Sequence, residues 1–362
     1  MRARKELATL NLPRWERACG MRSVFYPKLI NGPFGDPALY VRHAHHREAL
    51  LFDCGDLHRL SPGCRSRISA VFISHAHIDH LIGFDSLLRG FLYSDHTLYL
   101  YGPPGIISRI THRLAGYTWN LFDDLAFTLI VREWGEGSGQ EVRFEASRAF
   151  APQPIGEFDC SGGVLHRSPH YQIRAVPLTH GDIVSLAFSL EESLHIAIHK
   201  DALEREGFLP GPWLTRFKDL WRQGVDRETR LEVPLAKGGV LHVSLAQLHN
   251  AVAHSERGMK VVYVTDVSPM AANIRAITAL AAQAHLLVIE AVFTHADLER
   301  ARKRNHLTAR LAGEIARAAE ARKMLVFHHS PRYIHCGDML LNEARSAFSS
   351  GNRSEPAKDT TL

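Results

Sequence analysis

The first half of the chain alternates short apolar runs with turn residues, a pattern typical of buried β-strands. This pattern predicts strands at Ala49–Phe52, Ser69–Ser74, Leu98–Tyr101, Ile173–Leu178 and Val184–Leu190. Apolar residues at helical spacing predict a helix at Leu81–Leu92. Residues 132–170 are rich in Gly, Pro, Ser and charged residues, which indicates hairpins and loops.

The second half alternates strand-like apolar runs with amphipathic helices. Strands are predicted at Val261–Thr265, Leu286–Glu290 and Met324–Phe327, and helices at Ile274–Ala284 and Ala309–Ala321. Regular alternation of strands and helices is typical of the α/β class.

Residues 191–224 interrupt this rhythm. They contain a predicted helix at Asp201–Glu206, a rigid corner at Pro210–Gly211–Pro212 and an amphipathic helix at Trp213–Trp221. We interpret 191–224 as a protruding insertion in a domain that spans 21–346. Residues 1–20 are expected to form an N-terminal extension, and residues 347–362 a polar C-terminal tail.

The composition is that of an ordinary globular protein, with 45% hydrophobic and 22% charged residues and a formal net charge of +5. No apolar run reaches the ~18 residues that a membrane span requires. Five cysteines without a C-x-x-C pair argue against a disulfide scaffold or a zinc finger and favour a cytoplasmic protein. The unusual feature is the 23 histidines, because histidine is the commonest metal ligand.

The strongest candidate chemistry lies in Ser74–His80, where an apolar strand runs into four potential metal ligands. Residues two apart in an extended segment face the same side, so His75 and His77 can bind one ion. The chain then turns, and Asp79 and His80 can face an adjacent position. Imidazole and carboxylate together suit zinc or another borderline divalent metal.

Three later residues, His180, Asp266 and His328, each end a predicted strand and can converge on one sheet edge. The Asp266 carboxylate could bridge two ions. Taken singly, each residue would more often be an ordinary loop residue. Together with the first cluster they become candidate ligands.

This ligand pattern resembles the metallo-β-lactamase fold and, within it, the ribonuclease Z family, which processes tRNA 3′ ends. The supporting segments are Leu51–Gly55, Tyr101–Gly105, Glu290–Phe293, Asn305–Ala309 and His328–Tyr333. The family's usual N-terminal Gly-Thr-Gly turn and Lys/Arg-Asn loop are replaced by Tyr26–Gly32, which indicates a divergent branch.

The resemblance implies an αββα sandwich, in which two central β-sheets are flanked by helices, with 191–224 as a protruding arm. It also implies a pair of divalent metal ions per subunit, with zinc as the first expectation and manganese or magnesium as alternatives. The implied ligands form two groups joined by a bridging Asp266: His75, His77 and His180 on one ion, and Asp79, His80 and His328 on the other.

Asp79 and His306 are the candidate catalytic residues. Asp79 could orient the attacking water or accept its proton. The resemblance implies that His306 is the acid that protonates the leaving ribose oxygen, with Glu290 as a hydrogen-bond partner. Alternatively, His306 only begins a helix that Thr308 caps.

The candidate substrate contacts are cations near the catalytic histidine and a turn in the insertion: Arg302, Lys303, Arg304, Arg332, Gly211 and Pro212. The basic run could bind phosphates or could be a solvated helix end. The Gly211–Pro212 turn resembles the Gly-Pro element of the family's tRNA-gripping arm. The resemblance also implies a homodimer in which one subunit's arm serves the other's site.

These features predict a metal-dependent phosphodiesterase of the ribonuclease Z type that cleaves RNA, including the 3′ ends of tRNA precursors. One alternative is a small-molecule hydrolase that acts on a thioester, lactone or cyclic phosphodiester at the same centre. The other is a non-enzymatic RNA-binding protein that kept the fold, although a complete ligand set argues against it.

Overall fold

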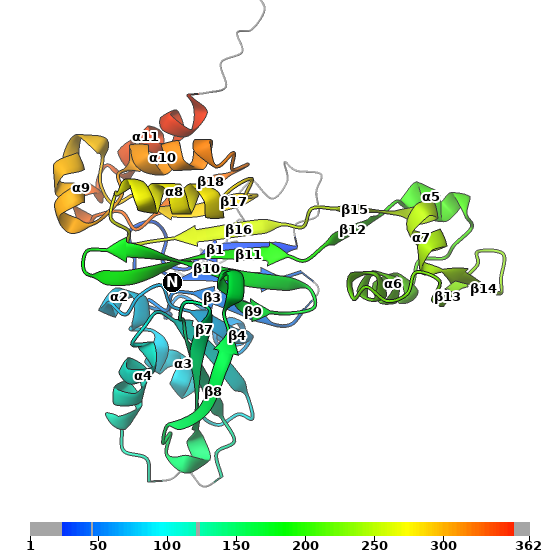
Figure 1. The fold of residues 1–362 in the computed structure, drawn as a ribbon, viewed down its shortest axis with the longest axis horizontal. Coiled ribbons are helices and arrows are strands. Elements are labelled where there is room, and N and C mark those ends of the chain that lie inside the picture. The colour runs from blue at the N-terminus through cyan, green and yellow to red at the C-terminus, as the bar shows by residue number, and fades with distance from the viewer. Residues whose placement is uncertain (1–23, 45, 121–123, 351–362) are drawn as a thin grey trace, which may run out of the picture.

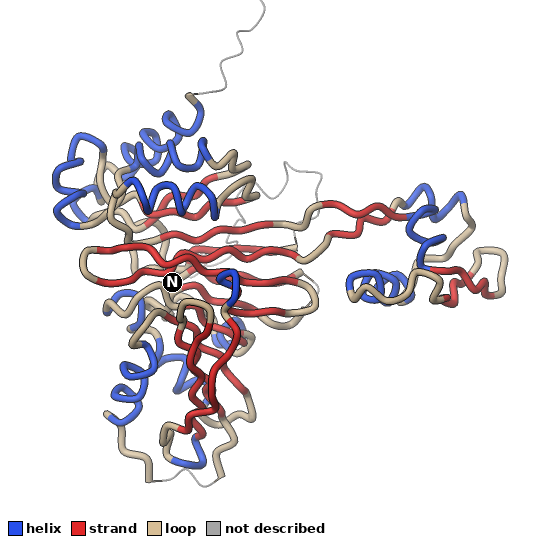
Figure 2. The backbone as a smooth tube through the Cα atoms, viewed as in Figure 1, coloured by secondary structure: helices blue, strands red, loops and turns tan. Residues whose placement is uncertain are grey.

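The computed structural model describes residues 24–44, 46–120 and 124–350. The extension predicted at 1–20 and residues 351–362 of the predicted tail lie outside this part of the chain. The described residues form two large β-sheets packed face to face, with helices on both outer faces (Figures 1 and 2). The αββα sandwich is therefore confirmed.

The first sheet has eight strands among the described residues, and their order in the sheet follows the chain. The strands are β1 (Phe25–Leu29), β2 (Leu39–His43), β3 (Ala49–Phe52), β4 (Ile68–Phe72), β5 (Thr97–Gly102), β6 (Thr128–Glu133), β7 (Ser138–Glu145) and β8 (Gln153–Asp159). Strands β3 to β6 run parallel to one another. The helices of this half are α1 (Pro62–Arg65), α2 (Ile78–Leu81), α3 (Phe84–Phe91) and α4 (Ile106–Ala115).

The second sheet has the described order β18-β17-β16-β11-β10-β9. Its strands are β9 (Val164–Arg167), β10 (Tyr171–His180), β11 (Ile183–Glu192), β16 (Lys260–Val264), β17 (Leu286–Glu290) and β18 (Met324–Phe327). The helices of this half are α8 (Ala271–Leu280), α9 (Leu298–Arg304), α10 (Ala309–Ala318) and α11 (Gly337–Ser349). Every described helix is too short or too polar to cross a bilayer.

The core is divided into layers by the alternation of side chains along the strands. Phe52 and Phe72 point between the two sheets, where they belong to one apolar cluster with Tyr263 of the second sheet. Their neighbours Leu51 and Val71 point to the outer face and belong to the cluster beneath α3 and α4. Strands β3 and β4 are therefore buried on both faces, which explains their continuous apolar sequences.

The helix predicted at Leu81–Leu92 is confirmed over Phe84–Phe91 as α3, but its start is wrong, because Leu81 ends a separate helix, α2, before Gly83. The Gly83 N–H donates to the Cys54 carbonyl (2.8 Å). A Cβ atom on Gly83 would lie 2.1 Å from the Gly55 carbonyl oxygen. At Gly83 the chain packs closely against the residues that follow β3, and this contact separates α2 from α3.

A protruding arm leaves the second sheet after β11 and returns before β16 (Figure 1). Its elements are β12 (His195–Ile198), α5 (Lys200–Arg205), α6 (Trp213–Arg222), β13 (Arg230–Pro234), β14 (Val240–Ser244), α7 (Leu245–Val252) and β15 (Ala253–Glu256). Strands β12 and β15 pair to form its stalk. The insertion predicted at 191–224 covers only the first half, because Phe217 of α6 needs Val233 and Leu248 to complete a separate apolar core.

Candidate metal centre

The predicted ligands come from both sheets and meet at the edge where β4, β10, β16 and β18 end. Each ligand lies at or just after the end of a strand. His75 and His77 lie between β4 and α2, and Asp79 and His80 lie in the first turn of α2. His180 ends β10, Asp266 follows β16, and His328 follows β18.

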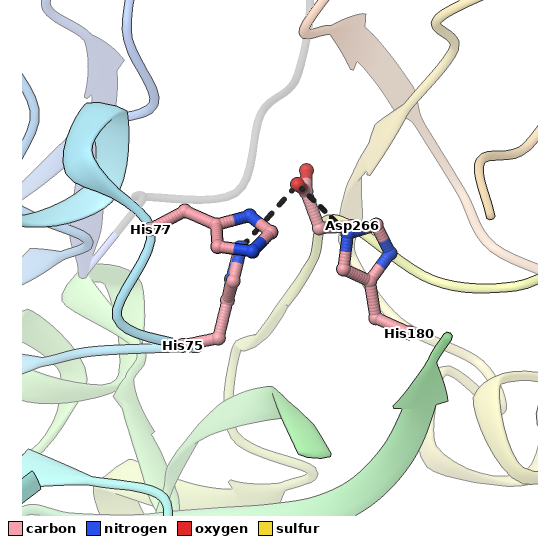
Figure 3. A group of neighbouring side chains, drawn as sticks. All are labelled: His75, His77, His180 and Asp266. Carbon is pink, nitrogen blue, oxygen red and sulfur yellow. Dashed lines mark ion pairs between the residues drawn. The ribbon is translucent and has the colours of Figure 1, made fainter. Parts of the chain in front are cut away.

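One group of potential ligand atoms comes from His75, His77, His180 and Asp266, which lie within 4.8 Å of one another (Figure 3). The Oδ2 atom of Asp266 lies 3.4 Å from His75 Nε2 and 3.7 Å from His180 Nε2. Figure 3 shows the three imidazoles and the carboxylate pointing toward one another, with His75 and His77 on one segment and His180 and Asp266 on two others.

A second group comes from Asp79, His80 and His328. The Oδ2 atom of Asp79 lies 3.5 Å from Nε2 of both His80 and His328. Asp266 joins the two groups, because its Oδ2 is 3.6 Å from His80 Nε2 and its Oδ1 is 2.8 Å from His328 Nδ1. The structure thus brings all seven predicted ligands together, with Asp266 between the two groups.

The chemistry of these groups fits divalent metal ions. His75 Nε2 and His80 Nε2 are buried and have no hydrogen-bond partner among the described residues. Ligand atoms about 2.0–2.1 Å from a tetrahedral zinc ion lie about 3.4 Å from one another. The spacings of 3.4, 3.6 and 3.7 Å around Asp266 Oδ2 are close to that value. The nitrogen and carboxylate donors are also those that zinc prefers.

Charge at the centre is set by Asp266. Burial alone would raise the pKa of this carboxyl, but the neighbouring His328 and His80 outweigh it and hold the pKa well below its usual range. Burial lowers the pKa values of His75 and His180. An ionised bridging carboxylate and neutral imidazoles are the forms that bind metal.

Two of the candidate ligands, Asp266 and His328, have a strained backbone conformation. Asp266 has a φ of 43° and His328 a φ of 57°, both in the left-handed region that disfavours residues other than glycine. Such conformations persist only where the surrounding structure enforces them, and they cluster at functional sites.

Asp53 is a residue of this site to which the sequence analysis assigned no role. Its fully buried carboxylate lies 2.8 Å from His80 Nδ1 and accepts hydrogen bonds from the Ser74 N–H (2.7 Å) and the Tyr263 hydroxyl (2.8 Å). These contacts fix the His80 ring so that Nε2 faces Asp266. The available sequence signal is an aspartate directly after a fully apolar strand.

His306 lies beside the two groups and is held by Glu290, as expected. Its Nδ1 is 3.0 Å from Glu290 Oε2, and its ring centroid is 5.1 Å from that of His180 and 5.7 Å from that of His328. Thr308 caps α10 by accepting a hydrogen bond from the Leu311 N–H. This cap is the one that the helix-start alternative assumes, so it does not separate the two interpretations of His306. The contact with Glu290 is the observation that ties His306 to the ligand groups.

The Glu290 carboxylate is fully buried and organises the loop around His306. It accepts hydrogen bonds from the backbone N–H groups of Asp266 (3.0 Å) and Leu307 (2.9 Å). Burial opposes its ionisation, but His306 outweighs this effect and lowers the pKa of Glu290 to about 2. Burial likewise disfavours the charged form of His306, and Glu290 outweighs it, so that the pKa of His306 is raised.

The predicted substrate contacts lie farther from the ligand groups. Arg302 forms an exposed ion pair with Glu299 of the same helix (2.8 Å), and Lys303 and Arg304 complete the last turn of α9. Arg332 Nη1 lies 3.7 Å from Asp297 Oδ1. Gly211 and Pro212 precede α6 in the arm, well separated from the ligands in the same chain (Figure 1). All six stay predictions.

Comparison with known proteins places this geometry in a family. The sequence profile described as "Beta-lactamase superfamily domain" matches residues 50–192. Ribonuclease Z from Deinococcus radiodurans is 30% identical over 311 residues, which cover 84% of this chain and 90% of that protein. The chain belongs to the ribonuclease Z family.

Further matches agree with this assignment to the ribonuclease Z family. Ribonuclease Z from Haloferax volcanii is 27% identical and covers 83% of this chain and 81% of its own length. The crystal structure of the short form of human tRNase Z has a TM-score of 0.51 at 20% identity and covers 85% of this chain and 93% of that chain. At 20% identity, the similarity to the human structure concerns the fold alone. The chain is thus a ribonuclease Z-like hydrolase of the metallo-β-lactamase fold, and its His and Asp clusters are consistent with a dinuclear metal site.

Proposed function

We propose that this protein is a dinuclear-metal phosphodiesterase that cleaves RNA endonucleolytically, including the 3′ ends of tRNA precursors. Zinc is the proposed metal. His75, His77 and His180 would hold one ion, and Asp79, His80 and His328 would hold the other, with Asp266 available to both. When bound, such ions supply Lewis-acid stabilisation of the negative charge that develops during phosphodiester hydrolysis.

The observation that carries this proposal is the His306–Glu290 pair beside a complete set of ligands. A leaving ribose alkoxide needs a proton, and an imidazole with a raised pKa can donate one near neutral pH. Glu290 fixes the ring by binding Nδ1, so Nε2 is the nitrogen left to meet the substrate. The relatives named ribonuclease Z, matched over most of the chain, support RNA as the substrate.

Asp79 serves as the carboxylate that orients the attacking water. Burial would raise its pKa, but His328 and His80 outweigh burial and hold the pKa far below its usual range. The side chain keeps 36% of its surface exposed, more than the 18% of His328. It therefore stays ionised and can orient a water molecule by accepting a hydrogen bond from it.

The decisive experiment is to incubate metal-replete protein with a 3′-extended tRNA precursor and map the product ends. We expect a single endonucleolytic cut near the mature 3′ end, and we expect a chelator to abolish it. A panel of thioesters, lactones and cyclic phosphodiesters is run in parallel. Rapid turnover of one of these, without RNA cleavage by protein of verified metal content, would favour the small-molecule hydrolase instead.

We also propose that the arm of one subunit serves the metal centre of a second copy in a homodimer. In one chain the arm and α2 lie on opposite sides of the sandwich (Figure 1), so a tRNA gripped by the arm is directed away from that chain's own centre. At tRNA concentrations below the KM of the armless protein, mixing a His306→Ala subunit with a subunit that lacks the arm should give faster cleavage than either protein alone. Failure to complement, in mixtures shown by light scattering to contain dimers, would exclude this arrangement.

A further inference from the structure

A second histidine cluster lies at the edge of the sandwich where β2 ends and β10 begins. His43 ends β2, His46 follows it, and His170 lies in the turn between β9 and β10. The ring centroid of His46 lies 4.3 Å from that of His43 and 4.3 Å from that of His170. The ring centroids of His43 and His170 are 6.1 Å apart. In the metal centre, His75 lies at comparable distances from His77 (4.3 Å) and His80 (4.1 Å).

These three imidazoles line a cavity of about 500 Å³. Its wall also includes Ser69 and Thr97, at the beginnings of β4 and β5. The metal centre, by contrast, follows the end of β4. The cavity therefore opens at the edge of the sandwich opposite the metal centre and is a separate place in the fold.

We propose that His43, His46 and His170 bind a further divalent transition-metal ion of the zinc type, distinct from the dinuclear centre. Three imidazoles around an accessible cavity are a donor set that suits zinc. Burial and the neighbouring His46 lower the pKa of His170, which favours the neutral form that ligates metal. Glu48 lines the same cavity and adds a carboxylate to the available donors.

Binding requires some rearrangement of side chains. The groups of described residues whose ligand atoms lie within 4.8 Å of one another all lie at the dinuclear centre or include its neighbours Glu290 and His306. The rings of the second cluster therefore turn about their Cβ–Cγ bonds to direct nitrogens at one ion. His46 is exposed and His170 is half-buried, so both have room to turn.

An ion at this position would brace the root of the arm. The His170 carbonyl accepts a hydrogen bond from the Ser193 N–H (2.9 Å), directly before the stalk strand β12. His170 also lines a small cavity of about 120 Å³ with Asp219 and Arg222 of α6. The ion would thus connect the end of β2 and His46 to the β9–β10 turn, which contacts the arm.

The test is metal stoichiometry on the full chain. Stripped protein is equilibrated by dialysis against buffered Zn²⁺, and bound zinc is measured by mass spectrometry. We expect about three ions per chain for the natural sequence and about two for a His46→Ala/His170→Ala variant. A His112→Ala/His242→Ala variant, which changes two exposed histidines outside both clusters, is the matched control and should keep all the zinc.

Titration with Co²⁺ after the dinuclear centre is filled with Zn²⁺ gives an independent measurement. The natural sequence should show the visible absorption of a nitrogen-ligated cobalt site, and the His46→Ala/His170→Ala variant should not. Equal zinc content and equal cobalt absorption in the natural and variant proteins, both folded by circular dichroism, would overturn the proposal. Neither measurement depends on RNA cleavage, so this outcome is separate from the fate of the proposed function.

Discussion

The metal centre and the arm differ in how far apart along the chain their contacting residues lie. At the centre, Asp53 is bound by Tyr263, 210 residues later, and His180 Nδ1 lies 2.9 Å from the Asn305 carbonyl oxygen, 125 residues later. In the arm, the apolar core is built entirely from residues between Leu194 and Ala253. The centre thus depends on the whole sandwich, whereas the arm depends mainly on itself. We therefore expect mutations in the centre to change the rate of hydrolysis, and mutations in the arm to change the binding of tRNA.

The largest expected effect is the loss of the bridging carboxylate. Asp266→Ala should reduce turnover of every substrate by about 10³-fold or more, because the charge stabilisation of a metal centre is worth several kcal/mol. Bound zinc, measured by mass spectrometry, should fall in parallel. Full metal content in this variant would contradict the ligand assignment of Asp266.

Replacing His306 with Ala separates acid catalysis from metal binding. We expect kcat for precursor tRNA to fall by about 10²–10⁴-fold, the usual contribution of a general acid. Zinc content should not change, since His306 is placed outside the ligand set. A substrate with a nitrophenolate leaving group, which needs no proton, should lose much less activity. An equal loss on both substrates would show that His306 is not the acid.

Asp53 tests whether the distant contacts of the centre matter. Asp53→Asn keeps the size of the side chain but weakens its hold on His80, and partners of this kind affect metal affinity by about 10–100-fold. The measurement is a competition between the protein and a chelator for zinc. The matched control is Asp56→Asn, an exposed carboxylate close in sequence whose neighbour is His58. Equal affinities in the two variants would refute a positioning role for Asp53.

Removal of the arm tests the other side of the comparison. Replacing residues 194–257 with a short Gly-Ser linker should raise KM for precursor tRNA by about tenfold or more, because contacts to the tRNA phosphates are lost. Hydrolysis of bis(p-nitrophenyl) phosphate should stay within about twofold, since the centre holds its own contacts. A matched loss on both substrates would mean that the arm supports the centre itself.

The smallest expected effect concerns the root of the arm and acid pH. Glu192 lies 3.1 Å from His195 Nδ1 and accepts a hydrogen bond from the Met259 N–H (2.9 Å). Burial would raise its pKa, but these bonds lower it below the ordinary 4.5. The stabilisation is therefore complete above pH ~4.5 and is lost as pH falls through the lower folded-state value.

Hydrogen exchange of β12 and β15 measures this effect directly. Glu192→Gln should speed exchange in the stalk near neutral pH, by an amount that corresponds to about 1–2 kcal/mol. The difference from the natural sequence should shrink as the pH falls below ~4. A difference that stays constant with pH would rule out the carboxylate charge as its cause.

Much of the fold and of the candidate ligand set can be predicted from the sequence, for physical reasons that are visible in particular segments. The strand predicted at Ala49–Phe52 matches β3, and the one predicted at Leu286–Glu290 matches β17. Both have the continuous apolar run that burial on two faces requires, which in β17 ends before Glu290. The ligands in His75–His80 are close in sequence, so strand and turn geometry alone bring them near one another.

The parts that could not be predicted depend on contacts between distant segments. Nothing local to Leu51–Gly55 shows that Tyr263 donates to Asp53. The break at Gly83 arises from the Gly55 carbonyl, which lies beside it only after β3 and β4 have paired. The extent of the arm was also missed, because its second half has no strong pattern until it packs against α6.

The sequence by itself determined the α/β class, the ligand-bearing strand ends and the resemblance to ribonuclease Z, since each of these depends on local order along the chain. The tertiary structure decided which side chains meet: Asp266 between two ligand groups, Glu290 on His306, and His170 beside His43 and His46. A histidine count cannot distinguish these two clusters. The fold does, because the two ends of a strand such as β10 lie at opposite edges of the sandwich, with His170 at one and His180 at the other.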